Sequence, residues 1–114
     1  MADVEKLSLT AITRTQLDLA RQSSSGRSAT TVFGGHEHTL RQTVIAISAS
    51  HDLDEHANPG EATVYVLHGR VRLAAGDVSW DGSHGDLLIV PNAPHSLEAL
   101  EDAVVLLTVA KHSQ

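Results

Sequence analysis

The sequence predicts a single all-β domain, a small closed barrel or sandwich, with one short helix near its N-terminus. From residue 28 onward, short runs rich in Val, Ile, Leu and Thr alternate with turn signals about eight to twelve residues apart, a rhythm typical of antiparallel sandwiches and barrels. No helical pattern separates these runs, so a parallel α/β sheet is disfavoured. The chain has 114 residues, enough for one hydrophobic core and too few for two.

Residues 1–27 form an N-terminal extension that differs from the rest of the chain. Apolar residues recur in it at helical spacing: Leu9, Ile12, Leu17 and Ala20. This pattern predicts a short amphipathic helix around residues 13–21, with Thr10 or Thr13 as its N-cap and the Ser-Ser-Ser-Gly sequence 23–26 as its end. We expect the helix to pack against the barrel or against a partner subunit.

Residues 28–114 are expected to form the barrel. The expected strands are 28–33, 40–48, 63–67, 70–74, 78–80, 87–90, 96–100 and 103–109. Glycine, proline, Asn and Asp supply the backbone conformations for reversal between them, at Gly34-Gly35, Asn58-Pro59-Gly60, His68-Gly69, Gly76-Asp77, Asp81-Gly82, Gly85-Asp86 and Pro91-Asn92-Ala93-Pro94.

Composition excludes several classes of partner. The net charge is −6, with 8 Lys and Arg against 14 Asp and Glu, and no Lys or Arg lies between Arg72 and Lys111, so we expect no nucleic acid partner. The longest apolar run, residues 103–109, falls far below the ~20 residues that a membrane span needs. The first residues are acidic where a secretory signal is basic, so a cytoplasmic location is expected.

Cysteine is absent, which leaves His, Asp, Glu and amide oxygens as the good metal ligands, and eight His are present. The stretch from His56 to Val71 resembles the first cupin motif, and Gly85 to Ser96 resembles the second, with its Gly-Asp turn, buried strand, proline turn and terminal His. Together the motifs span residues 53–109, about half of the chain. The chain thus resembles the small single-domain bacterial cupins of the RmlC-like jelly-roll family.

The resemblance implies a cupin-type double-stranded β-helix, or jelly-roll barrel, with a metal site of three His and one Glu. In that family the site holds iron, manganese, nickel, copper or zinc. Here His56 and His95 match the pattern, whereas Asn58 replaces the second His and Ala62 replaces the Glu. We therefore expect at most a weakly bound divalent ion, Fe, Mn, Ni or Zn, on His56 and His95.

Strand alternation places positions 56, 58 and 62 on one face, and we expect His95 to meet them from the opposing sheet. Gln42 is a further candidate, because it could point inward together with Val44. The expected ligand pocket is therefore formed by His56, His95, Asn58 and Gln42. Glu61 has the wrong parity for this pocket, and the segment His36-Glu37-His38 is expected to be a solvated loop.

Three functions follow from these residues. The first is a binding module that holds a small molecule in the barrel through a degenerate His-based site. The second is a divalent-metal-dependent enzyme of oxygenase or isomerase type, and the third is a structural dimer with a decayed site. Two segments, 44–47 and 104–107, are apolar on both faces, which favours a homodimer because a second subunit would cover one of these faces.

Overall fold

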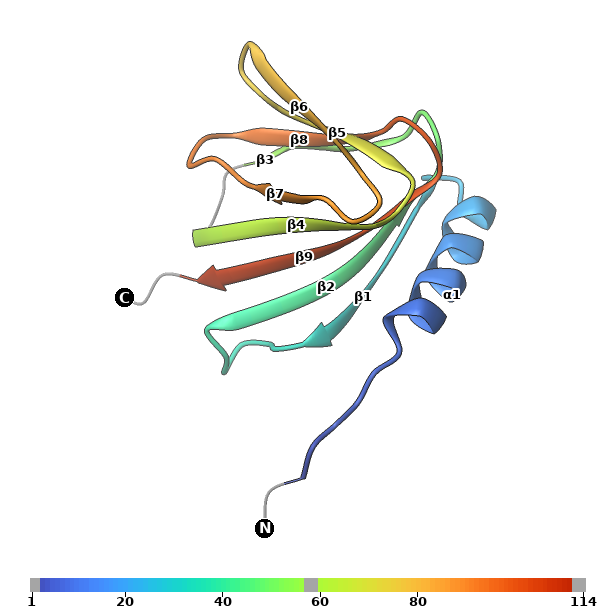
Figure 1. Cartoon of the computed structure of the whole chain (residues 1–114), viewed down its shortest axis with the longest axis vertical. Coiled ribbons are helices and arrows are strands. Elements are labelled where there is room, and N and C mark those ends of the chain that lie inside the picture. Colours follow the sequence, from blue (N-terminus) through green and yellow to red (C-terminus); the bar gives the residue numbers. More distant parts are fainter. Residues whose placement is uncertain (1–2, 57–59, 112–114) are drawn as a thin grey trace.

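The computed structural model describes residues 3–56 and 60–111, apart from the side chains of residues 55 and 56, as an antiparallel β-barrel flanked by one helix (Figure 1). The elements are α1 Leu9–Gln22, β1 Arg27–Phe33, β2 Leu40–Ile47, β3 Asp52–His56, β4 Gly60–His68, β5 Arg70–Ala75, β6 Val78–Ser83, β7 Leu87–Ile89, β8 His95–Ala99 and β9 Ala103–Lys111. One sheet has the order β1-β2-β9-β4-β7 and the other β3-β8-β5-β6. All described strand pairs are antiparallel, which confirms the expected all-β class.

The strands β2 and β9 are apolar on both faces because each faces a different cluster. Ile45 and Ile47 lie in the core between the two sheets. Val44 and Ala46 lie in a second cluster with Leu17 of α1. The helix of the same chain therefore covers the second apolar face, for which the sequence suggested a partner subunit.

The helix begins earlier than the sequence predicts. It runs from Leu9 to Gln22 rather than over residues 13–21, and its N-cap is Ser8, not Thr10 or Thr13. The Ser8 side chain accepts a hydrogen bond from the Ala11 amide at 3.1 Å. At 14 residues α1 is too short to cross a bilayer, and it is the longest helix in the described part of the chain.

The expected strands are present, but β4 begins at Gly60, which was expected in a turn, rather than at residue 63. Two further differences concern β3 and β6. An unpredicted strand, β3, pairs with β8. The turn expected at Asp81-Gly82 is wrong, because β6 continues through both residues to Ser83. A Cβ on Gly82 would lie 3.1 Å from Leu88 Cδ1, so glycine there permits close packing between the edges of the two sheets rather than a chain reversal.

One end of the barrel is the mouth, where β2, β4 and β8 begin and β7 and β9 end. The β5–β6 hairpin projects beyond the body of the barrel (Figure 1). At the opposite end, the β8–β9 loop contacts the last turn of α1, where the Arg21 Nε donates to Asp102 at 2.8 Å. The motif residues His95 and Ala62 both lie toward the mouth.

Candidate functional site

His95 is the first residue of β8 and faces the barrel interior. It is 6% exposed and alternates along the strand with the buried residues Leu97 and Ala99. Its Nδ1 lies 3.0 Å from the Ala93 carbonyl oxygen, which can only accept, so Nδ1 carries the proton. This bond anchors the ring to the loop between β7 and β8.

Residue 56 lies beside His95 and not across the barrel from it. The Cα of His56 is the register partner of His95 in the β3–β8 pair, after a register shift that follows Leu53. The expectation that the two motif histidines approach from opposing sheets is therefore wrong, because both belong to one sheet. Asn58, the third expected pocket residue, lies outside the described residues.

The first row of inward positions at the mouth on the β4 sheet is Arg41, Val109, Ala62 and Val90. Arg41 pairs with Val109 and Val109 pairs with Ala62. The Val90 amide donates to the Ala62 carbonyl at 3.0 Å, which extends the row to Val90. Ala62, at the carboxylate position of the cupin motif, is 9% exposed and belongs to the interior cluster. The inward orientation expected for position 62 is confirmed.

On the other sheet, the inward positions at the mouth carry apolar side chains around His95. Ala75 pairs with Val78, and one step deeper Leu73 pairs with both Leu97 and Trp80. Val78 is 51% exposed and Trp80 is 45% exposed, although Leu73 between the strands is buried. An exposed apolar rim thus borders His95 on the hairpin side of the mouth.

Gln42 does not belong to this site. Val44 and Ala46 face α1, so Gln42, which has the same parity on β2, also lies on the outer face. Its Nε2 donates to Thr108 Oγ1 at 3.2 Å, and it lines an outer hollow of about 760 Å³ with Phe33 and His38. The expectation that Gln42 points inward with Val44 is therefore wrong.

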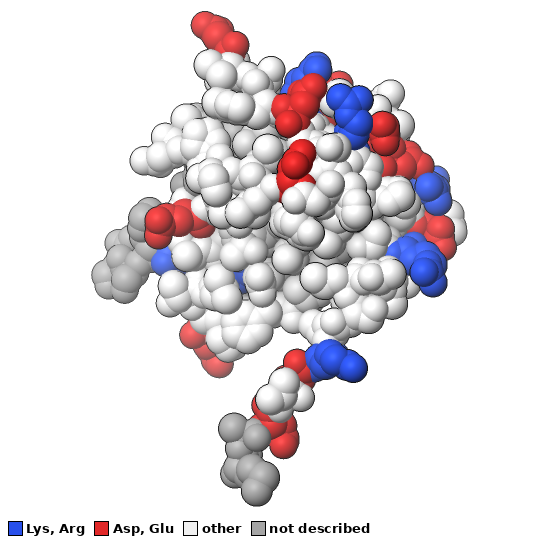
Figure 2. Space-filling model, in the orientation of Figure 1, with Lys and Arg blue, Asp and Glu red and all other residues white. Residues whose placement is uncertain are grey.

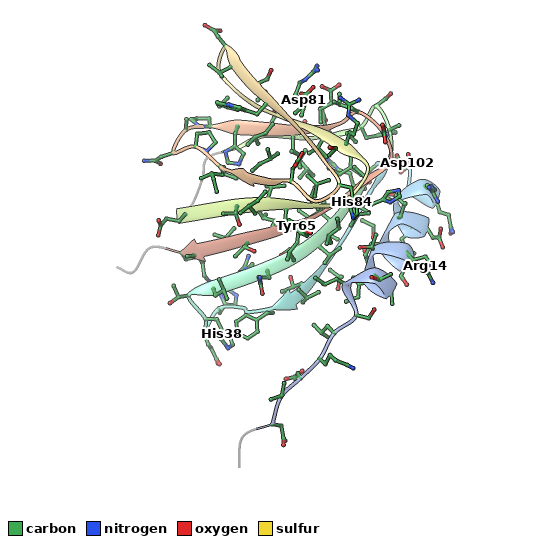
Figure 3. All side chains as sticks on the ribbon, viewed as in Figure 1. Arg14, His38, Tyr65, Asp81, His84 and Asp102 are labelled. Carbon is green, nitrogen blue, oxygen red and sulfur yellow. The ribbon has the colours of Figure 1, made fainter. Side chains whose placement is uncertain are left out.

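The loop between β1 and β2 carries His38, which lies at the lower left in Figure 3. His38 contacts Phe33 edge to face, with 5.1 Å between the ring centroids, and both His36 and His38 are exposed, as expected for a solvated loop. Glu61 is also exposed, on the outer face of β4, as its parity predicted.

The described residues do not fit a cupin metal centre. No three His, Asp or Glu side chains of residues 3–54 and 60–111 lie close enough together to hold a metal ion. The methyl group of Ala62 occupies the inward position where a cupin centre has its carboxylate, and the inward row beside it is apolar up to Arg41. Catalytic metals usually have at least three good protein donors, a number that these residues do not provide.

Sequence reasoning missed Arg41. The signal for Arg41 was present, because it lies an even number of residues before Ile45 and Ile47 on one uninterrupted strand. The strand was expected to be buried on both faces, so its pattern did not identify which parity faced the interior. That ambiguity also caused the error for Gln42.

No protein-family model matches this sequence, and no curated protein matches it. Solved structures are nonetheless similar to it. The conserved SPY1581 protein of unknown function from Streptococcus pyogenes is 20% identical, with 100% of this chain and 93% of that chain covered and a TM-score of 0.73. An RmlC-like cupin from Desulfovibrio desulfuricans is 25% identical over 74% of this chain and 81% of that chain, with a TM-score of 0.65.

The salicylate 1,2-dioxygenase from Pseudoaminobacter salicylatoxidans is 18% identical and has a TM-score of 0.73. The similarity covers 89% of this chain but 33% of that chain. These similarities show the fold and confirm the expected jelly-roll barrel.

Proposed function

We propose that this chain, which has the fold of a small cupin, binds a small molecule at the barrel mouth, with His95 as the polar contact. The observation that carries the proposal is the place of His95. Among the described residues it is the single buried polar side chain that faces the barrel interior, since Gln16 lies on α1. Every other buried inward side chain of the described core is apolar.

The local structure supports a binding role for His95. Removing a polar group from water costs free energy unless it is hydrogen-bonded, and the Nδ1 of His95 donates to the Ala93 carbonyl. The same bond fixes the ring orientation at the mouth, beside small Ala75 and the exposed Val78 and Trp80. Pockets for small molecules combine apolar walls with a few fixed polar groups of this kind.

The chemistry of the donors favours a metal-poor site over a metal-dependent enzyme. The inward position of Ala62 removes the anionic ligand, and His95 with position 56 supplies two of the four donors of the cupin pattern. The oxygenase or isomerase alternative would need a donor set beyond the residues that the structure describes.

The test is a thermal-shift screen of small acids and sugars on three proteins: wild type, His95→Ala and His84→Ala. His84 is an exposed loop histidine and serves as the matched control. A ligand at 100 times its Kd stabilises a folded protein by about 2.7 kcal/mol, which gives a measurable shift. We expect the shift in wild type and His84→Ala and its loss in His95→Ala, each measured against the same protein without ligand.

Three results would contradict the proposal. A ligand shift retained in His95→Ala would remove His95 from the site. Stoichiometric metal in protein purified without an affinity tag, lost in the His56→Ala, His95→Ala double variant, would replace the proposal with the metal-dependent alternative. A protein that responds to no compound in the screen would support the third function, a structural dimer.

A further inference from the structure

Arg41 places a positive charge at the barrel mouth on the inner face of β2. The pairing of β2 with β9 is regular from Leu40 to Ile47, so the alternation that puts Ile45 and Ile47 in the core puts Arg41 on the same face. Arg41 is exposed because it lies in the first inward row, at the open end of the barrel. Arg41 therefore lies in the same row as Val109 and Ala62.

No carboxylate of the described residues forms an ion pair with Arg41. The ion pairs of the described residues involve Arg21, Arg70 and Arg72, and Arg41 makes no side-chain hydrogen bond with the described part of the chain. The inward positions of the mouth on β2, β9, β4, β8, β5 and β6 that the structure describes hold no Asp or Glu: Arg41, Val109 and Ala62, followed by Val90, on one sheet, and His95, Ala75 and Val78 on the other. Where a cupin metal site has its carboxylate, this mouth has a methyl group and an unpaired guanidinium in the same row.

We propose that the ligand of the mouth is a small monocarboxylate with an apolar body, and that Arg41 binds its carboxylate. This inference rests on the proposed function and specifies its ligand class. A guanidinium matches a carboxylate with two parallel hydrogen bonds, and a partly enclosed site strengthens that pair. The apolar body of the ligand contacts Val78 and Trp80, and His95 supplies a further polar contact.

The spacing of the strands allows this arrangement. Arg41 and Ala62 lie on strands separated only by β9, so their backbones are about 10 Å apart. An extended arginine side chain covers most of that distance along the row. Ala62 itself presents only a methyl group at its inward position, and the described inward residues of the two rows are not acidic.

Trp80 is the single tryptophan of the chain, so its fluorescence reports binding at the mouth directly. The experiment titrates benzoate and hexanoate, and their neutral amides benzamide and hexanamide, into wild type, Arg41→Met and Arg14→Met. Arg14 is an exposed helix residue without an ion pair among the described residues, so its variant controls for the change in net charge.

We expect at least one of the two acids to bind wild type and Arg14→Met about tenfold more tightly than its amide, because a hydrogen bond to a charged group contributes about this much. Arg41→Met is expected to bind that acid about tenfold more weakly and its amide unchanged. Equal binding of acid and amide, an unchanged affinity in Arg41→Met, or no binding of either acid to wild type would each overturn the inference. If the amides bind and His95→Ala abolishes that binding, the proposed function survives while the carboxylate assignment fails.

Discussion

At the scale of single residues, Asp102 connects three parts of the chain at the end of the barrel opposite the mouth (Figure 3). Its carboxylate accepts from the Ala49 amide and from Arg21 Nε, both at 2.8 Å. It therefore ties the end of α1 and the loop after β2 to the β8–β9 loop. The hydrogen bond from Ala49, and after it the one from Arg21, holds the pKa of Asp102 below its ordinary value.

We predict that Asp102→Asn lowers the free energy of unfolding by about 1 to 2 kcal/mol at neutral pH, since hydrogen bonds to a charged group are lost or weakened and the site is partly open to solvent. Because the folded-state pKa is depressed, the contribution is complete above the unfolded pKa of about 3.9 and is lost as the pH falls through the lower folded pKa. Urea unfolding between pH 7 and pH 3 would measure both effects.

The control for this variant is Asp81→Asn. Asp81 also has a lowered pKa, mainly from its hydrogen bond with Arg72, but both partners are exposed on the β5–β6 hairpin. Exposed ion pairs contribute little, so a smaller loss is expected there. A wild-type minus Asp102→Asn difference that stays constant down to pH 3 would contradict the assigned role.

At the scale of elements, the start of α1 depends on Ser8. Its side chain accepts from the Ala11 amide, and its carbonyl accepts the first helical hydrogen bond from Ile12. Ser8→Ala should destabilise the protein by about 1 kcal/mol, the usual cost of losing an N-cap. Thr10, one of the two caps suggested by the sequence, lies exposed inside the helix, so Thr10→Ala should change little. Equal losses in the two variants, measured by chemical unfolding, would mean that the helix starts elsewhere.

The sequence predicted most strands because their turns are chemically explicit. Gly34, Gly69, Gly76 and Gly85 all adopt positive φ at expected reversals, and Asp86 closes its turn by accepting from the Ser83 amide. The strand β3 was missed because Asp52-Leu53-Asp54-Glu55-His56 has one apolar residue and low strand propensity. The segment is a strand because it pairs with β8, and this long-range interaction cannot be recognised from the local sequence.

The sequence predicted which residues belong to the candidate site better than it predicted where those residues lie relative to one another. The motif located His95 and the inward position 62 correctly. The relation between positions 56 and 95 depends on strand order, and their common sheet followed from the pairing of β3 with β8. Whether Gln42 faces the barrel interior or the outside depends on which face of β2 packs against the helix, because both faces of that strand are buried.

At the scale of the whole molecule, the structure changes the argument for a homodimer. The helix α1 covers the outer faces of β2 and β9, but Tyr65, Leu87 and Ile89 remain exposed on the outer face beyond it. Tyr65 pairs with Leu87, and Thr63 beside it pairs with Ile89, so these side chains form one patch on β4 and β7. We name these three residues the β4–β7 patch.

We propose that the β4–β7 patch binds a second copy of this chain. The chain has a net charge of −6, so two copies repel unless they meet through an uncharged surface. Figure 2 shows that much of the centre of the face in view lacks charged side chains. A two-fold contact brings the same patch of both copies together, so a single uncharged surface is enough to form the interface.

We therefore predict a dimer at micromolar concentration by light scattering, and a monomer for the Leu87→Asp, Ile89→Asp double variant, because four buried carboxylates would face each other in its dimer. Leu87 and Ile89 are 56% and 70% exposed in the single chain, so the double variant should fold with unchanged circular dichroism. Val78→Asp, at another exposed apolar position, on the mouth rim, is the control and should remain dimeric. A monomeric wild type would remove the dimer, and a double variant that stays dimeric would place the interface on another surface.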